Sequence, residues 1–205
     1  MRVQMTEVYR NWINSLKDRS GRARVQVRVD RLVNGNPGQH RTLTDDVCEL
    51  KIDFGPGYRV YYIERGGVVV VLLAGGDKST QQRDIKAAIS LAKNLQEYLA
   101  MRKTVKKSSP KTKTVPYDVS EQLRTPEEMA AYLDAWFSEA PDDAVGIARA
   151  LGDIARAKGM TQVARDAGLS RESLYKALGE NGNPSFATVL KVARALGVRL
   201  HAQPA

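Results

Sequence analysis

Residues 47–74 read VCELKIDFGPGYRVYYIERGGVVVVLLA, and this stretch decides the fold of the first half of the chain. Apolar and polar side chains alternate over residues 47–53, as in a strand with one covered face. A second strand candidate, residues 58–64, follows the turn FGPG. The apolar run at residues 68–74 is expected in the middle of a sheet, where both faces are covered. Together these segments predict an antiparallel meander.

Helical patterns flank the meander. Residues 6–17 repeat apolar side chains at helical spacing, which predicts an amphipathic helix. Residues 22–33 fit both a strand alternation and a helical stripe, and we interpret them as a helix. After the strands, Ser79 and Gln82 have the spacing of a capping box, and a helical pattern continues to Leu99. The expected order is helix, helix, meander, helix.

The net charge of +9 is unevenly distributed along the 205 residues. Residues 1–105 hold 18 Lys and Arg against 11 Asp and Glu, and residues 106–116 hold four lysines and no acid. Residues 117–205 hold 10 Lys and Arg against 12 Asp and Glu. A basic first half favours polyanionic partners, and a slightly acidic second half has the sign needed to neutralise it.

A change in composition separates the two halves. Residues 101–118 read MRKTVKKSSPKTKTVPYD and show neither helical nor strand periodicity. We interpret this part as a flexible basic linker, whose lysines keep it solvated and can also contact phosphate. The predicted organisation is a domain at 1–103, a linker at 104–118 and a second domain at 119–205.

Composition also limits the compartment and the chemistry. No apolar run approaches the roughly 18 residues that a membrane helix needs. Cys48 is the single cysteine, so it forms no internal disulfide and is expected to fill core space. We expect a cytoplasmic protein with no membrane partner, no metal and no cofactor.

The second half is predicted to be helical throughout. Thr125 and Glu128 form a capping box at the start of its first helix, and a second helix is expected at residues 142–158. Residues 160–178, MTQVARDAGLSRESLYKAL, place two short helices around Gly168. This spacing is typical of a helix-turn-helix, and it also occurs in plain helical corners.

A helix-turn-helix reads DNA with the outer side of its second helix. Ser170 is expected to cap that helix, and a last helix at residues 185–197 is expected to close the bundle. The residues predicted to contact DNA are Gln162, Ser170, Arg171, Ser173 and Lys176.

The run ELKIDFGPGYRVYYIERGGVVVVLLAGGDKSTQQRDIKAAISLA, residues 49–92, resembles toxins of the RelE/ParE superfamily, particularly the HigB-type killer proteins of addiction modules. The likeness covers most of residues 1–100 and implies an α+β fold with an antiparallel sheet. RelE-like members are ribosome-dependent endoribonucleases that cut mRNA, whereas ParE-like members act on DNA gyrase. The resemblance leaves both targets open.

RNA cleavage through the 2′-hydroxyl needs a proton acceptor, cations for the developing charge and a donor for the leaving oxygen. With His40 and His201 as the only histidines, lysine and arginine must carry these roles. The resemblance implies that Arg59 stabilises the phosphate, that Lys78 lies at a cationic corner and that Lys51 takes the position of a base.

Residues 117–203 resemble HigA-type antitoxins of the addiction-module antidote family. This resemblance implies an all-α helix-turn-helix domain that binds operator DNA as a homodimer and represses its own operon. It also implies direct contact with a toxin, here within the chain or swapped between copies.

The two resemblances together predict a toxin–antitoxin fusion in which an mRNA interferase is inhibited by its linked antitoxin. One alternative is a DNA-binding regulator with a degenerate toxin domain. It is left open because Glu49 replaces a lysine often found at that position, and no tyrosine closely follows Lys78. The other alternative is a ParE-like gyrase inhibitor with its antitoxin.

Overall fold

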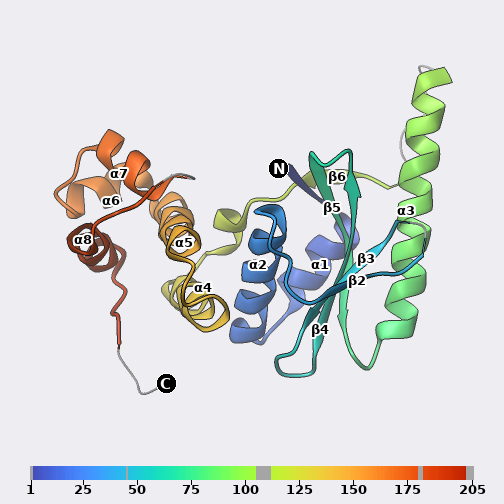
Figure 1. Ribbon diagram of the computed structural model, residues 1–205, viewed down its shortest axis with the longest axis horizontal. Coiled ribbons are helices and arrows are strands. Elements are labelled where there is room, and N and C mark those ends of the chain that lie inside the picture. Colours follow the sequence, from blue (N-terminus) through green and yellow to red (C-terminus); the bar gives the residue numbers. More distant parts are fainter. Residues whose placement is uncertain (1, 45, 105–111, 180–181, 202–205) are drawn as a thin grey trace. The chain divides into compact units, whose positions relative to one another are not determined.

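The computed structural model describes residues 2–44, 46–104, 112–179 and 182–201 (Figure 1). The chain forms two compact units, Met1–Asp118 and Val119–Ala205. The first contains a sheet with helices on both faces, and the second is helical, so the predicted α+β class is confirmed.

The described part of the first unit contains a six-stranded sheet in the order β2-β3-β4-β5-β1-β6. The predicted meander is confirmed, because β3, β4 and β5 pair antiparallel in sequence order. β1 lies parallel to β5, so the sheet is mixed, and the sequence did not predict β1, β2 or β6. The strand bounds are β1 Arg2–Thr6, β2 His40–Thr42, β3 Cys48–Ile52, β4 Tyr58–Arg65, β5 Val69–Asp77 and β6 Thr114–Pro116.

The described residues of this unit form the helices α1 Glu7–Ser15, α2 Arg19–Val33 and α3 Gln81–Thr104. The interpretation of residues 22–33 as helix is confirmed. Side chains cap the first two helices, since Thr6 accepts from the backbone of Tyr9 and Asp18 accepts from that of Gly21. The predicted capping box after β5 is wrong: α3 begins at Gln81, directly after Thr80.

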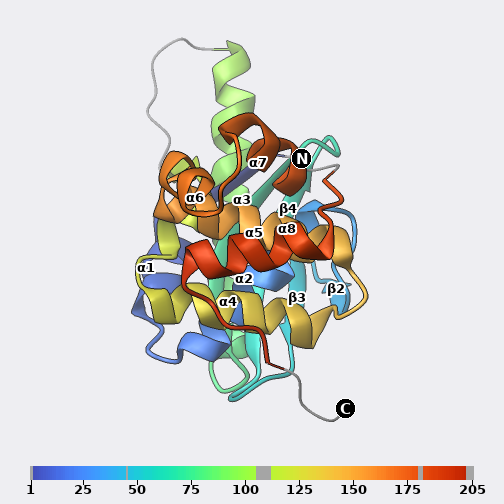
Figure 2. The same ribbon diagram turned by 90° about the vertical axis from the view of Figure 1, so that its left-hand side faces the viewer.

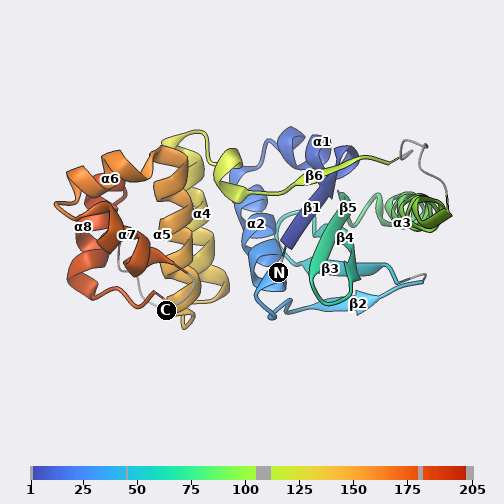
Figure 3. The same cartoon turned by 90° about the horizontal axis from the view of Figure 1, so that it is seen from above.

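Helices cover both faces of the sheet, with α1 and α2 on one face and α3 on the other (Figures 1 and 3). The apolar run of β5 is buried on both sides, as predicted. Val70 and Leu72 join the core under α1 and α2, and Val71 and Leu73 join the core under α3. This alternation fixes which side chains of the neighbouring strands share each face.

The second unit contains the 3₁₀ helix η1 and helices α4 to α8. The capping box of α4 is confirmed, because Thr125 and Glu128 exchange both hydrogen bonds. α5 packs against α4, α6, α7 and α8 (Figure 2). The bounds are η1 Val119–Gln122, α4 Pro126–Glu139, α5 Ala144–Lys158, α6 Met160–Asp166, α7 Arg171–Leu178 and α8 Phe186–Leu196.

The predicted linker at 104–118 requires a correction. Residues 114–116 form β6, which pairs antiparallel with β1 at the edge of the N-terminal sheet. The prediction of a flexible linker is therefore wrong for residues 114–116, and also for Thr104, which is the last residue of α3. The lysine- and threonine-rich composition of the segment is typical of coil. For residues 105–111 the prediction falls outside the described part of the chain.

Candidate functional site

A hollow of about 430 Å³ lies in the N-terminal unit at the edge formed by β2, β3 and β4. Lys51 and Arg59 are direct cross-strand partners there. Because Leu50 and Ile52 point into the core under α1 and α2, Lys51 and Arg59 lie on the opposite face, the one that α3 covers. The residues that line the hollow are Gln39, His40, Arg41, Glu49, Lys51, Arg59 and Gln81.

Arg59 is the most buried cation of this hollow, with 5% of its surface exposed. Its Nη1 donates to the carbonyl oxygen of Tyr58 at 2.8 Å. Its Nε is buried and has no hydrogen-bond partner among the described residues. A buried guanidinium with an unused donor is suited to bind a phosphate or carboxylate.

Lys51 lies beside Arg59 and forms an ion pair with Asp53, at 2.9 Å between Nζ and Oδ2. The hydrogen bond from Lys51 is the main cause that holds the pKa of Asp53 below its usual value. Both side chains are about half exposed, at 44% and 52%. Since exposed ion pairs contribute little free energy, Lys51 can exchange Asp53 for a ligand at small cost.

Glu49 is buried beside these cations, with 3% of its side chain exposed. Its carboxylate accepts from Arg41 Nε at 2.5 Å and from Gln81 Nε2 at 2.6 Å. The acid at the position where the resemblance has a lysine thus holds Arg41, whose side chain is 56% exposed. Sequence reasoning gave Glu49 no role and missed Gln81, because their contact joins residues far apart in the chain and no pattern within one element predicts it.

His40 borders the same hollow but is poorly placed for catalysis. It lies opposite Leu50 in the β2–β3 ladder, and Arg41 lies opposite Glu49. Strand alternation therefore directs the imidazole to the face opposite that of Arg41. Its Nδ1 lies 2.9 Å from the carbonyl oxygen of Gly38.

Lys78 lies in a neighbouring hollow of about 350 Å³ at the corner between β5 and α3. Gln81 lines both hollows. A Cβ placed on Gly57 would lie 3.5 Å from Arg59 Nη1 and 3.6 Å from Lys78 Cβ, so Gly57 separates the two cations. Asp77 shapes the corner by accepting hydrogen bonds from Ser79, which lower the pKa of Asp77. The three predicted cations are therefore near one another, with Lys78 outside the hollow of the other two.

In the second unit, α6 and α7 meet at a turn around Gly168. Gly168 has φ = 65°, and a Cβ there would meet no atom within 4 Å, so the glycine is required by conformation and not by space. The predicted cap of α7 is confirmed, because Ser170 Oγ accepts from the backbone of Ser173 at 3.0 Å.

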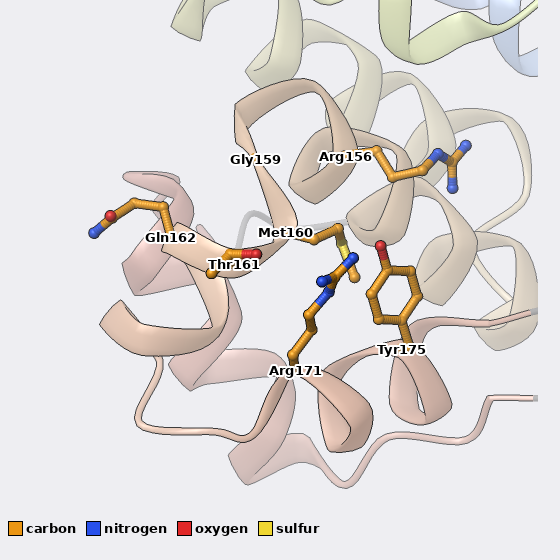
Figure 4. Close-up of a pocket in the computed structure, with 7 residues that line it drawn as sticks. All are labelled: Arg156, Gly159, Met160, Thr161, Gln162, Arg171 and Tyr175. Atoms are coloured by element: carbon orange, nitrogen blue, oxygen red, sulfur yellow. The ribbon is translucent and has the colours of Figure 1, made fainter.

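A hollow of about 560 Å³ lies between the start of α6 and α7 (Figure 4). The Arg171 guanidinium is 5.4 Å from the centre of the Tyr175 ring, and both side chains extend toward Met160. Gln162 points away from them and donates to Asp166 at 2.7 Å. The lining residues are Arg156, Gly159, Met160, Thr161, Gln162, Arg171 and Tyr175.

The predicted DNA residues are thus only partly grouped. Gln162 and Arg171 line the hollow of the second unit, and Ser170, Ser173 and Lys176 do not. All five side chains are exposed. Ser170 caps α7, and Arg171, Ser173 and Lys176 lie on the exposed side of that helix. Sequence reasoning missed Tyr175, although its position four residues after Arg171 is the spacing of helical neighbours.

Within the described ranges, no helix has the length and apolar character required to cross a bilayer. The same ranges contain no group of three or more His, Cys, Asp or Glu side chains arranged to hold a metal ion.

Comparison with known proteins gives a family match in the second half. Residues 113–204 match the family described as "Probable addiction module antidote protein". Two uncharacterized proteins of Haemophilus influenzae (strain Rd) are similar to parts of the chain. One is 43% identical over 95 residues, which are 46% of this chain and 96% of the relative. The other is 53% identical over 87 residues, 42% of this chain and 88% of the relative. No solved structure matches the chain.

Proposed function

Because the chain belongs, over residues 113–204, to the family of probable addiction module antidote proteins, we propose that it joins a toxin to its antidote in one polypeptide. The family membership supports an antitoxin-type role for the second half. The observation that supports a toxin in the first half is the cationic hollow, in which the buried Arg59 lies opposite Lys51. This hollow is in the N-terminal unit, Met1–Asp118.

The proposed toxin activity is cleavage of mRNA on the ribosome. In a reaction through the 2′-hydroxyl, negative charge develops on the phosphorane oxygens. Arg59 supplies a preorganised donor for that charge, and Arg41, held by Glu49, adds a second guanidinium. Lys78, on the other side of Gly57, approaches the neighbouring phosphate or the leaving oxygen.

Lys51 is assigned to charge stabilisation as the second cation beside Arg59. In the free protein its Nζ lies 2.9 Å from Asp53 Oδ2. When RNA binds, the phosphate takes the place of Asp53.

The proposed role of the second unit, besides neutralisation, is repression of its own operon. In this proposal the outer side of α7 enters the major groove, where Arg171 and Lys176 contact base edges and phosphates. Ser170 and Ser173 at its start, with Gln162 on α6, approach the DNA backbone. A homodimer through α8 brings two such helices to one operator, because Phe186 is 71% and Leu190 45% exposed on that helix.

The experiment is controlled expression in bacterial cells of three chains: the full protein, residues 1–118, and residues 1–118 with Arg59→Ala. We expect residues 1–118 to arrest growth with loss of mRNA, and the other two chains to permit growth. Growth arrest with intact mRNA and failed supercoiling supports a gyrase inhibitor instead. If folded residues 1–118 do not affect growth, the toxin proposal is wrong.

A further inference from the structure

The segment at residues 112–117, called the strap below, is built into the N-terminal sheet. Its strand β6 pairs antiparallel with β1 in the register Gln4↔Pro116, Met5↔Val115 and Thr6↔Thr114. Past the strand, the backbone N–H of Tyr117 donates to the carbonyl oxygen of Val3 at 3.1 Å. The strap therefore covers an edge of β1 that would otherwise present unpaired backbone groups.

Side chains of the strap continue the core under α1 and α2. Val115 and Tyr117 pack against this core. The Tyr117 ring meets Tyr9 edge-on, with 6.3 Å between ring centres and 70° between planes, and Tyr9 is fully buried. Thr114 adds a side-chain hydrogen bond to Gln4. The contact thus has apolar anchors on one face and a backbone ladder along its edge.

The sequence match assigns most of the strap to the antidote, whereas the structure assigns the strap to the N-terminal unit. The antidote match begins at residue 113, whereas the compact N-terminal unit extends to Asp118. The first residues of the antidote are therefore packed inside the unit that carries the cationic hollow. A mere connection between two domains needs neither a ladder nor a tyrosine packed against the core.

We propose that the strap is the antidote's docking peptide: an extended segment that binds the β1 edge of the toxin unit and stays bound without a covalent connection. The proposal rests on the proposed function, because that function identifies one part as toxin and the other as antidote. What is new is the docking surface, formed by β1 and Tyr9, and the segment that binds it, a β-strand followed by an aromatic side chain.

The position of the strap separates docking from access to the hollow. β6 lies at one edge of the sheet, and β2 lies at the other, with β1 and β5 between β6 and the strand that carries Arg59. The strap consequently holds the antidote without touching Lys51 or Arg59. Loss of the strap is expected to release the antidote and to leave the hollow intact.

The test inserts a protease site within residues 105–111 of the full chain, and the folded protein is cut and passed through gel filtration. We expect the two fragments to elute together. Tyr117→Ala should raise their dissociation constant at least about tenfold, because it removes the aromatic side chain that packs on Tyr9. Lys113→Ala, an exposed change in the same segment, should leave the elution unchanged.

Separation of the wild-type fragments at micromolar concentration would overturn the proposal, as would fragments with Tyr117→Ala that remain together as firmly as the wild type. If Tyr117→Ala prevents folding, Thr114→Ala is used, with amide hydrogen exchange of residues 2–6 in the uncut chain; faster exchange is expected, and unchanged exchange contradicts the docking. None of these readouts requires toxin activity. Fragments that stay together while residues 1–118 leave growth unaffected contradict the proposed function alone.

Discussion

Arg41 and Glu49 face each other across the β2–β3 ladder, and Arg41 Nε donates to Glu49 Oε2 over 2.5 Å. The carboxylate is buried, and most of the Arg41 side chain is exposed at the mouth of the hollow. A buried acid that accepts from Arg41 and from Gln81 ties the edge strand, the sheet and the start of α3 together. Glu49 lowers the positive charge of the site, but it also holds Arg41 and Gln81 in position there.

We predict that Glu49→Ala destabilises residues 1–118 by about 1–3 kcal/mol, because two donors lose their buried acceptor. Asp53→Ala, which breaks the exposed pair with Lys51, should cost less than about 1 kcal/mol. Urea unfolding followed by fluorescence measures both, since Trp12 is the single tryptophan of this fragment. An equal or larger cost for Asp53→Ala would contradict the assigned role of Glu49.

The corner that carries Lys78 should respond to pH through Asp77. Hydrogen bonds from Ser79 lower the pKa of Asp77 in the folded state. The carboxylate therefore stabilises the fold above its unfolded pKa, and this stabilisation is lost as the pH falls through the lowered value. Asp77→Asn should be less stable than the wild type at neutral pH, and the difference should narrow from about pH 5 to about pH 3. Urea midpoints that keep a constant difference over this range would argue against the corner as described.

The turn between α6 and α7 depends on the backbone of Gly168, not on space around it. Gly168→Ala should lower the free energy of unfolding by about 1 kcal/mol, because a Cβ is disfavoured at positive φ. Gly168→Asn should cost less, since asparagine tolerates this conformation better. Thermal unfolding of both variants tests the order, and alanine at least as stable as glycine would contradict it.

Operator binding should depend on the outer side of α7. Arg171→Ala should weaken binding to an inverted-repeat promoter fragment and reduce the slope of log K against log salt by about one phosphate contact. Lys191→Ala removes the same charge from an exposed position on α8 and serves as the control. Titrations at several salt concentrations measure both slopes. Equal losses from the two variants would indicate only a general effect of charge and would remove Arg171 from the DNA contact.

The sequence predicted elements whose pattern repeats within the element. The alternation in β3, the apolar run of β5 and the capping box of α4 each lie within one element, so each pattern predicts the structure of that element. Residues 22–33 carried two patterns, and their helical stripe was the better guide because α2 covers the sheet with one side. The short strands β2 and β6 show no such repeat, and their pairing partners lie elsewhere in the chain.

The candidate site likewise has features that follow from a local pattern and features that depend on residues far apart in the chain. That Lys51 and Arg59 share a face follows from the register of one hairpin, which the strand pattern limits strongly. The contact of Glu49 with Gln81 joins residues 32 positions apart, and no periodicity in the sequence predicts it. The strap was hidden for a related reason: its lysines and threonines are typical of a linker, and only the β1 edge gives Val115 and Tyr117 a place to pack.

The most direct test of a toxin and antidote in one chain is mRNA cleavage in a purified translation system, mapped by primer extension. Residues 1–118 should cut mRNA only when ribosomes are present, and the full chain should cut at least about tenfold more slowly because the linked antidote is present at high effective concentration. Arg59→Ala in residues 1–118 should abolish the cuts while the fold is retained. Intact mRNA with folded residues 1–118 on translating ribosomes would contradict the account.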